Sequence, residues 1–182
     1  MNVQEATTRR LPDLKGRYLP ENCRETINTI LKETYGYEQF RNLEIYDDLS
    51  KGKEKLCISQ GQLIENVILE AEKAWKSETQ VDNILLTAPT GSGKSLLFQL
   101  PAIYLGKEYN LLTIVVSPLK ALIVDQVESL QELGYMRVAY ASSDLSPEQK
   151  MEVYRQVREG EIDLFYLSPE LLLSYDIKHF VG

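Results

Sequence analysis

Two kinds of hydrophobic spacing divide the chain. Up to about residue 80, apolar residues recur every three or four positions, whereas beyond it short continuous apolar runs alternate with segments of that helical spacing. The first pattern is typical of amphipathic helices, and the second of buried parallel strands joined by helices. The patterns predict a polar, flexible leader over residues 1–18, a helical extension over 19–80 and an α/β domain over 81–182.

The N-terminal extension carries three segments of helical spacing. One covers residues 21–35, where Gly36 follows as a C-cap, and a second, shorter helix is expected over residues 38–49. The third starts near Ser59, which forms a possible capping box with Gln62. Its apolar stripe consists of Leu63, Ile64, Val67, Ile68, Ala71, Ala74 and Trp75.

The rest of the chain alternates strands with helices. The expected strands are "ILLTA" (84–88), "LLTIVVS" (111–117), "VAYAS" (138–142) and "IDLFYLS" (162–168), with helical segments between them. Such alternation predicts a mostly parallel sheet covered on both faces, a doubly wound α/β fold. Two helix starts are well marked, at Ser146-Pro147 with Gln149 completing a capping box, and at Ser168-Pro169.

Composition narrows the class of protein. No apolar run reaches the roughly 18 residues that a membrane span needs, so no membrane partner is expected. The two cysteines, Cys23 and Cys57, suggest neither a disulfide framework nor a zinc site, which favours the reducing cytoplasm. The net charge of −7 argues against a broadly basic nucleic-acid surface, but it allows local contacts from backbone amides and hydroxyls.

The most specific motif is "APTGSGKS", from Ala88 to Ser95, between an expected strand and an expected helix. It fits the phosphate-loop pattern except that Ala88 replaces the first glycine. Lys94 can reach the β- and γ-phosphates of ATP, and the Ser95 hydroxyl can bind Mg²⁺, so these two are the candidate catalytic residues. The predicted nucleotide-binding residues of the loop are Thr90, Gly91, Ser92, Gly93, Lys94 and Ser95.

Three ordered blocks resemble the RecQ-like branch of the superfamily 2 helicases, of DEAD/DEAH type. They are "APTGSGKSLLFQLPAIYL", which resembles motif I, "SPLKALIVDQVESLQELG", similar to motif Ia, and "AYASSDLSPEQKMEVYRQVREGEIDLFYLSPELLLS", similar to the segment that follows it. The resemblance implies a RecA-like lobe that uses ATP and Mg²⁺ to drive strand translocation and unwinding. It also makes Pro101 part of the motif I block, at a point where the helix is expected to bend or end.

Two segments compete for the adenine-reading motif of this family. "YGYEQFRNLE" supplies Tyr37 and Arg41, which could stack on the base, although Arg41 could equally form a surface salt bridge. "ISQGQLIENVI" supplies Gln62, whose amide can both donate to and accept from the adenine edge. Gln62 is favoured as the adenine reader, and a simple capping role remains the alternative.

The resemblance further implies that loops after the strands contact a nucleic-acid strand, single or partly duplex, with DNA favoured over RNA. The predicted contact residues are Ser117, Pro118, Lys120, Ser142, Ser168 and Pro169. Hydroxyls and helix N-termini make suitable phosphate contacts without a basic surface. The same Ser-Pro pairs also read as helix caps, and the two roles are compatible.

The sequence lacks the acidic box that holds Mg²⁺ in this family, because no Asp-Glu pair follows Lys94. We therefore expect the amino-terminal part of a first helicase lobe, with motif II and the second lobe downstream. By itself this chain is expected to bind ATP but not to hydrolyse it. Two other readings remain, a P-loop NTPase of another class and a non-catalytic nucleotide- or nucleic-acid-binding remnant.

Overall fold

The computed structural model describes residues 18–46, 55–76, 81, 83–86 and 91–173. They fall into two compact units. The first holds the described residues up to Lys32 and those from Gly36 to Pro101, and the second holds Glu33–Tyr35 and the described residues from Ala102 onward. The predicted leader lies outside the described residues except for Tyr18, so its flexibility remains a prediction.

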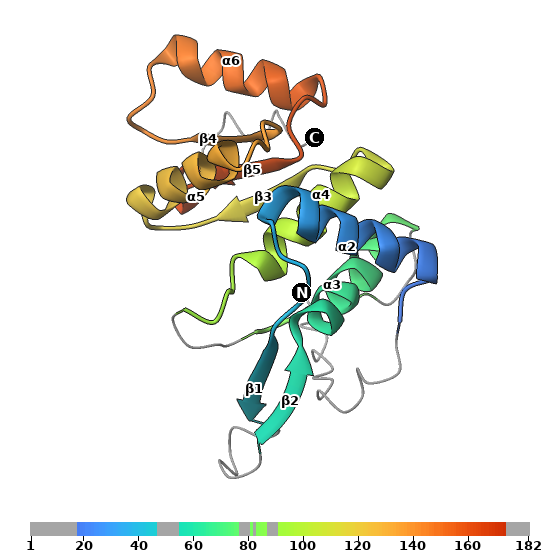
Figure 1. The fold of residues 1–182 in the computed structure, drawn as a ribbon. Coiled ribbons are helices and arrows are strands. Elements are labelled where there is room, and N and C mark those ends of the chain that lie inside the picture. Colours follow the sequence, from blue (N-terminus) through green and yellow to red (C-terminus); the bar gives the residue numbers. More distant parts are fainter. Residues whose placement is uncertain (1–17, 47–54, 77–80, 82, 87–90, 174–182) are drawn as a thin grey trace, which may run out of the picture. The chain divides into compact units, whose positions relative to one another are not determined.

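Two amphipathic helices dominate the first unit (Figure 1). Helix α2, Glu21–Tyr35, has the predicted bounds and ends at Gly36, which adopts the left-handed conformation with φ of 68°. Helix α3, Gln60–Trp75, buries Leu63, Ile64 and Ile68 as the apolar stripe predicts. The last turn departs from the stripe, since Ala74 and Trp75 are exposed.

A β-hairpin replaces the short helix that we predicted over residues 38–49. Strand β1, Asn42–Tyr46, pairs antiparallel with strand β2, Lys55–Ser59, so that Asn42 lies opposite Ser59. The helix prediction is therefore wrong. Apolar and polar residues alternate in "NLEIY", a period of two that favours a strand once a partner strand such as "KLCIS" is present.

A parallel three-stranded sheet organises the second unit. Its strands are β3, Thr113–Val116, β4, Val138–Ala141, and β5, Leu164–Leu167, in the spatial order β3-β5-β4. All four residues of the central strand β5 are buried, whereas Val116 of β3 is 43% exposed. The parallel arrangement confirms the predicted α/β class, and β5 is the strand covered on both faces.

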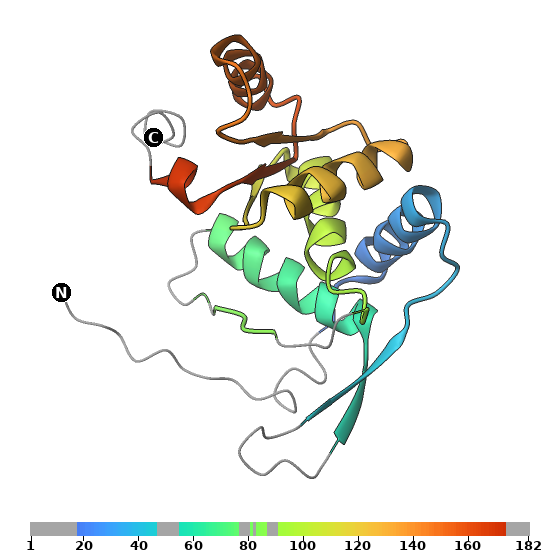
Figure 2. The same cartoon turned by 90° about the vertical axis from the view of Figure 1, so that its left-hand side faces the viewer.

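The strand order explains why the helices cover both faces. The connection from β3 to β4 passes over the place of β5, and the connection from β4 to β5 runs back in the opposite direction. Because such crossovers are right-handed in nearly all proteins, a reversal of direction is expected to put the second helix on the other face. Accordingly, α5, Lys120–Glu132, and α6, Pro147–Arg158, lie on opposite sides of the sheet (Figures 1 and 2).

The face of the sheet covered by α6 carries an apolar core. Phe165 and Leu167 of β5 pack there with Ala139 and Ala141 of β4, and Val157 of α6 closes over them. The ring of Tyr154 meets that of Phe165 edge to face, with centroids 6.4 Å apart. Alternate residues of each strand thus supply this face, as a period of two requires.

The expected strand over residues 84–88 is not observed in its described part. Residues 83–86 have no regular structure, and the Leu85 side chain is 91% exposed. Thr87 and Ala88 lie outside the described residues. An apolar run becomes a strand only where its backbone groups find a hydrogen-bonding partner, and residues 83–86 pair with no strand of the described sheet.

Helix α4, Leu96–Tyr109, does not end at Pro101 but runs through it. Nearly all of its residues up to Gly106 are buried, including Leu100 and Tyr104. Burial of this kind can offset the roughly 3 kcal/mol that an internal proline costs. Neither α4 nor any other described helix is long and apolar enough to cross a membrane.

Local capping signals were mostly correct. The Ser146 side chain accepts from the Gln149 backbone while the Gln149 side chain accepts from the Ser146 backbone, so the predicted capping box is confirmed. Ser168 caps α7, Pro169–Leu172, as expected. Ser59 also caps its helix, although it accepts from the Gly61 N–H and not from Gln62.

Candidate nucleotide site and nucleic-acid edge

The described part of the phosphate loop, Gly91 to Ser95, leads directly into α4. Gly91 and Gly93 have φ angles of 80° and 77°, a region that L-residues with side chains rarely adopt. The first helical bonds follow at once, since the Leu96 N–H donates to the Gly93 carbonyl at 3.2 Å. The loop therefore faces the positive end of the helix, as phosphate binding requires.

The loop fits a nucleotide phosphate by a second observation. The Ser92 hydroxyl oxygen is buried and has no hydrogen-bond partner within the part of the chain that the structure describes. A buried polar group without a partner costs free energy, so an additional ligand in the loop would satisfy it. These residues suit ATP, while Thr90, also predicted to contact it, lies outside the described residues.

Magnesium would be held by Ser95. Its position immediately before α4 matches the place of the Mg²⁺-binding hydroxyl in a phosphate loop. Among the described residues, no group of three or more His, Cys, Asp or Glu side chains is placed to hold a metal ion. The Ser95 hydroxyl would supply one ligand of the ion, and the nucleotide phosphates and waters would supply others.

Gln60 is a residue of the site that the sequence analysis missed. Its side-chain nitrogen donates to the Ser92 carbonyl of the phosphate loop at 3.1 Å, and its oxygen accepts from the Arg41 N–H at 3.2 Å. The side chain is 2% exposed. The sequence analysis missed Gln60 because strands β1 and β2 lie between Arg41 and Gln60. They separate the two candidate adenine segments along the chain.

The closed hairpin brings both competing adenine segments together. The Gln60 N–H donates to the Arg41 carbonyl at 2.9 Å, so the residues on either side of the hairpin are neighbours. Phe40, just before Arg41, packs so tightly on Gly61 that a Cβ there would lie 2.6 Å from the ring. The two segments that we treated as alternatives therefore lie next to each other.

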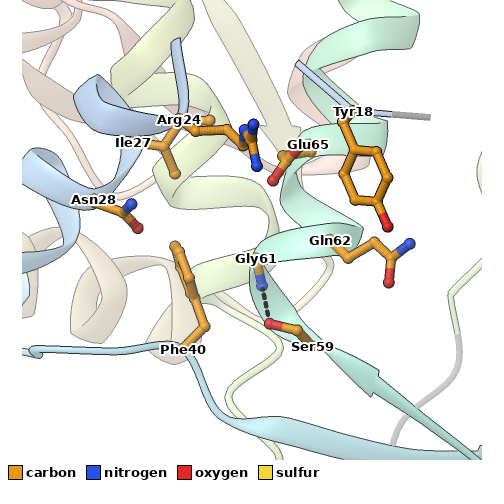
Figure 3. Close-up of a pocket in the computed structure, with 9 residues that line it drawn as sticks. All are labelled: Tyr18, Arg24, Ile27, Asn28, Phe40, Ser59, Gly61, Gln62 and Glu65. Atoms are coloured by element: carbon orange, nitrogen blue, oxygen red, sulfur yellow. Dashed lines mark hydrogen bonds between the residues drawn. The ribbon is translucent and has the colours of Figure 1, made fainter. Parts of the chain in front are cut away.

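Gln62 lines a pocket beside this junction (Figure 3). The pocket has a volume of about 310 Å³ and lies between the start of α2 and the start of α3. Figure 3 shows the Gln62 amide beside the Tyr18 ring, and the Arg24 side chain from α2 next to the Glu65 side chain from α3. Its lining residues are Tyr18, Arg24, Ile27, Asn28, Phe40, Ser59, Gly61, Gln62 and Glu65.

The side chains of Tyr37 and Arg41, which precede β1 in the sequence, contact each other. The Arg41 guanidinium lies 5.9 Å from the centre of the Tyr37 ring, a cation–π distance. Both side chains are exposed. A planar base could stack on the outer face of this pair, which is the role we predicted for the two side chains.

The predicted nucleic-acid contacts gather at the carboxyl edge of the parallel sheet. The Ser117 N–H donates to the Leu167 carbonyl at 3.0 Å, which joins the ends of β3 and β5. Lys120, at the end of the loop after β3, hydrogen-bonds to Ser143 and pairs with Asp144 at 2.9 Å. These contacts join that loop to the loop after β4. Ligands of open α/β sheets bind at this edge.

Charge at this edge is balanced locally. Lys120 holds the pKa of Asp144 below its usual range, chiefly through their hydrogen bond. The pKa of Glu170 is also lowered, first by a hydrogen bond to its own backbone and then by Ser168, with a smaller contribution from Lys120. The Lys120 amino group therefore lies among anionic groups, while Ser142 and Ser168 are almost fully buried.

An ion-pair cluster fixes the opposite, amino end of β5. Asp163 is 3% exposed and accepts from Arg137 Nε and Nη2 at 2.7 Å and from the Tyr135 hydroxyl at 2.6 Å. The hydrogen bond from Arg137 to Asp163 raises the pKa of Arg137, and burial together with the hydrogen bond from the Tyr135 hydroxyl to Asp163 raises the pKa of Tyr135. A buried carboxylate satisfied in this way holds the strand rigidly.

Together, the fold and the loop define a phosphate-loop nucleotide-binding α/β protein. A sequence model of the DEAD/DEAH box helicases matches residues 68–180, which is more than half of the chain. The chain belongs to this family.

Curated relatives point to the RecQ-like branch. The chain is 34% identical over 151 residues to the ATP-dependent DNA helicase RecQ of Synechocystis sp., which covers 83% of this chain and 25% of the relative. It is 32% identical to the RecQ helicase of Bacillus subtilis over 81% of this chain and 20% of that protein. Over 90 residues, half of this chain and 7% of the relative, it is 39% identical to the ATP-dependent DNA helicase Q4 of Mus musculus.

These matches confirm the resemblance found in the sequence motifs. The chain spans about a quarter or less of the length of these relatives. Its family membership and its fold are therefore established, while the activity of a whole helicase is a matter of proposal.

Proposed function

We propose that this chain forms the ATP-binding part of an ATP-dependent DNA helicase of RecQ-like type. The observation that carries the proposal is the loop from Gly91 to Ser95. Its glycines adopt positive φ angles, and its last residue immediately precedes α4. The match to the DEAD/DEAH box helicases and the names of the relatives support ATP-dependent helicase activity on DNA. ATP would supply the free energy for translocation along a nucleic-acid strand and for unwinding.

The residues have separable tasks in this proposal. Gly91 and Gly93 let the backbone approach the phosphates closely, Lys94 compensates the β- and γ-phosphate charge, and Ser95 offers its hydroxyl to Mg²⁺. Gln62 would read the adenine edge from the pocket that it lines, and Arg41 with Tyr37 would stack on the base. Gln60 would hold the loop in place through Ser92.

The nucleic-acid contacts would come from the carboxyl edge of the sheet. Lys120 would pair with a backbone phosphate, whereas the Ser146 and Ser168 side chains already accept from the first N–H groups of the helices that follow them. Ser117, Pro118, Ser142 and Pro169 belong to the same loops. Such contacts read the backbone and not the sequence, as translocation along any strand demands.

The nucleotide part is tested by titrating a fluorescent ATP analogue with and without Mg²⁺. Lys94→Ala should weaken binding by about 10- to 100-fold, the value of a lost charge-assisted hydrogen bond. Lys107→Ala, an exposed substitution in the same helix, is the control and should leave binding unchanged. Equal affinity of wild type and Lys94→Ala would reject the proposal.

A turnover assay tests the expectation that this chain binds ATP without hydrolysing it. Because the chain has no Asp-Glu pair after Lys94, we expect nucleotide binding without measurable hydrolysis, with or without single-stranded DNA. Hydrolysis that DNA stimulates and that Lys94→Ala abolishes would contradict this expectation. A cytoplasmic location also remains a proposal, consistent with the free thiols of Cys23 and Cys57.

A further inference from the structure

Asp144 occupies the edge where we propose phosphate contacts. Its Oδ1 accepts a hydrogen bond from Lys120 Nζ at 2.9 Å and another from the Ser143 hydroxyl at 3.3 Å. Its own N–H donates to the Ser142 hydroxyl at 3.3 Å, which fixes the turn after β4. A carboxylate is thus held against the one basic side chain among the predicted nucleic-acid contacts.

The Lys120–Asp144 pair can open. The two side chains are 47% and 70% exposed, and ion pairs at such sites are screened by water and contribute little to stability. A phosphate is also an anion and a hydrogen-bond acceptor, so it would compete with the carboxylate for the same amino group. The carboxylate also repels any phosphate that approaches while the pair is intact.

We propose that Asp144 is an intramolecular competitor for Lys120, which holds the amino group until a backbone phosphate of a single strand displaces it. The inference rests on the proposed role of Lys120 in nucleic-acid binding. Its consequence is a weaker, more salt-tolerant contact than a free lysine would make, because each binding event must first separate an internal ion pair. A weak contact is easily released, as a strand that moves past the edge requires.

Asp144→Asn isolates this effect. The substitution keeps the size of the side chain and leaves the N–H bond to Ser142 in place, so the turn should persist. Glu132→Gln is the matched control, since it removes one exposed negative charge from the far end of the helix that Lys120 begins. Lys120→Gln and the double variant Lys120→Gln/Asp144→Asn complete a cycle.

The experiment measures binding of the full chain to fluorescein-labelled oligothymidine of about 20 nucleotides by anisotropy over a range of salt concentrations. Asp144→Asn should tighten binding by about threefold to tenfold and steepen the salt dependence of the affinity, by up to about 0.7 in the logarithmic slope. In the Lys120→Gln background, Asp144→Asn should change the affinity by less than about twofold.

The remaining outcomes separate this inference from the proposed function. If Lys120→Gln weakens binding but Asp144→Asn does not tighten it, the competitor role fails and the nucleic-acid edge survives. An equal gain from Glu132→Gln, or an undiminished gain in the Lys120→Gln background, would make Asp144 an ordinary repelling charge and overturn the inference. If neither wild type nor Asp144→Asn binds the oligonucleotide, or if Lys120→Gln binds as well as wild type, the competitor role of Asp144 and the proposed nucleic-acid role of Lys120 both fail.

Discussion

Arg41 and Gln60 stand 19 positions apart in the sequence and are joined by two hydrogen bonds. The Gln60 N–H donates to the Arg41 carbonyl at 2.9 Å, and the Arg41 N–H donates to the Gln60 side-chain oxygen at 3.2 Å. The other end of the same amide donates to the Ser92 carbonyl of the phosphate loop. One buried side chain thus connects the root of the hairpin to the candidate nucleotide site.

This arrangement separates the roles of two neighbouring glutamines. Gln60→Leu removes both bonds of the buried amide, and we expect it to weaken ATP and GTP binding alike, by about tenfold, because it loosens the loop. Gln62→Leu leaves the loop intact but removes the proposed adenine reader, so it should weaken ATP more than GTP. Titration of fluorescent analogues of both nucleotides measures the two effects. A loss of ATP preference in Gln60→Leu alone would assign adenine reading to Gln60.

The two glycines of the loop make a second matched pair. Both have positive φ, so alanine at either position costs about 1–2 kcal/mol of backbone strain. Gly91 has nothing within 4 Å of the added Cβ, whereas the Cβ at Gly93 would lie 2.6 Å from the Gln60 side-chain nitrogen. Gly93→Ala should therefore weaken nucleotide binding and lower the melting temperature more than Gly91→Ala does. Indistinguishable variants would show that Gln60 yields without cost to the loop.

Much of the second unit could be predicted from the sequence, because its signals are local. The runs that became β3, β4 and β5 are apolar and β-branched or aromatic, and Ser146 with Gln149 marks the start of α6 without reference to the rest of the chain. The strand order β3-β5-β4 could not be predicted from the sequence. It depends on which strands pair in the folded sheet, and three similar apolar runs do not reveal that β5 lies between β3 and β4.

The failures in the first unit share a cause. Residues 42–46 form a strand only because residues 55–59 pair with them, and Ile84 to Leu86 form none because no described strand pairs with them. Strand formation depends on distant partners more than helix formation does. The same dependence hid Gln60, whose importance appears only once the hairpin closes and places Arg41 beside it.

Gly106 provides a test of packing around the amino end of β5. It is buried inside α4, where alanine would normally stabilise a helix by about 0.5–1 kcal/mol. Here an added Cβ would overlap the Asp163 side chain, which Arg137 and Tyr135 hold in place. We expect Gly106→Ala to lower the free energy of unfolding by about 1–3 kcal/mol in urea titrations. Lys107→Ala, exposed on the same helix, should change it by no more than about 0.5 kcal/mol, and a stabilised Gly106→Ala would contradict the rigid cluster.

Tyr135 should make the stability of the protein depend on alkaline pH. Burial and the hydrogen bond to Asp163 raise the pKa of its phenol above the ordinary value of about 10. The folded state therefore keeps a proton that the unfolded chain loses, so this stabilisation is fully present below about pH 10 and decreases above it, by at most about 1.4 kcal/mol per pH unit.

Tyr135→Phe has no proton to lose at this position. The variant should be less stable than wild type at neutral pH by about 1 kcal/mol, the contribution of the lost hydrogen bond. Because wild type alone loses the Tyr135 contribution as the pH rises, the difference between the two proteins should shrink between about pH 9 and about pH 11. Urea unfolding followed by circular dichroism at several pH values measures the difference. If it stays constant across that range, the phenol titrates alike in the folded and unfolded chains, and the hydrogen bond to Asp163 does not hold its proton.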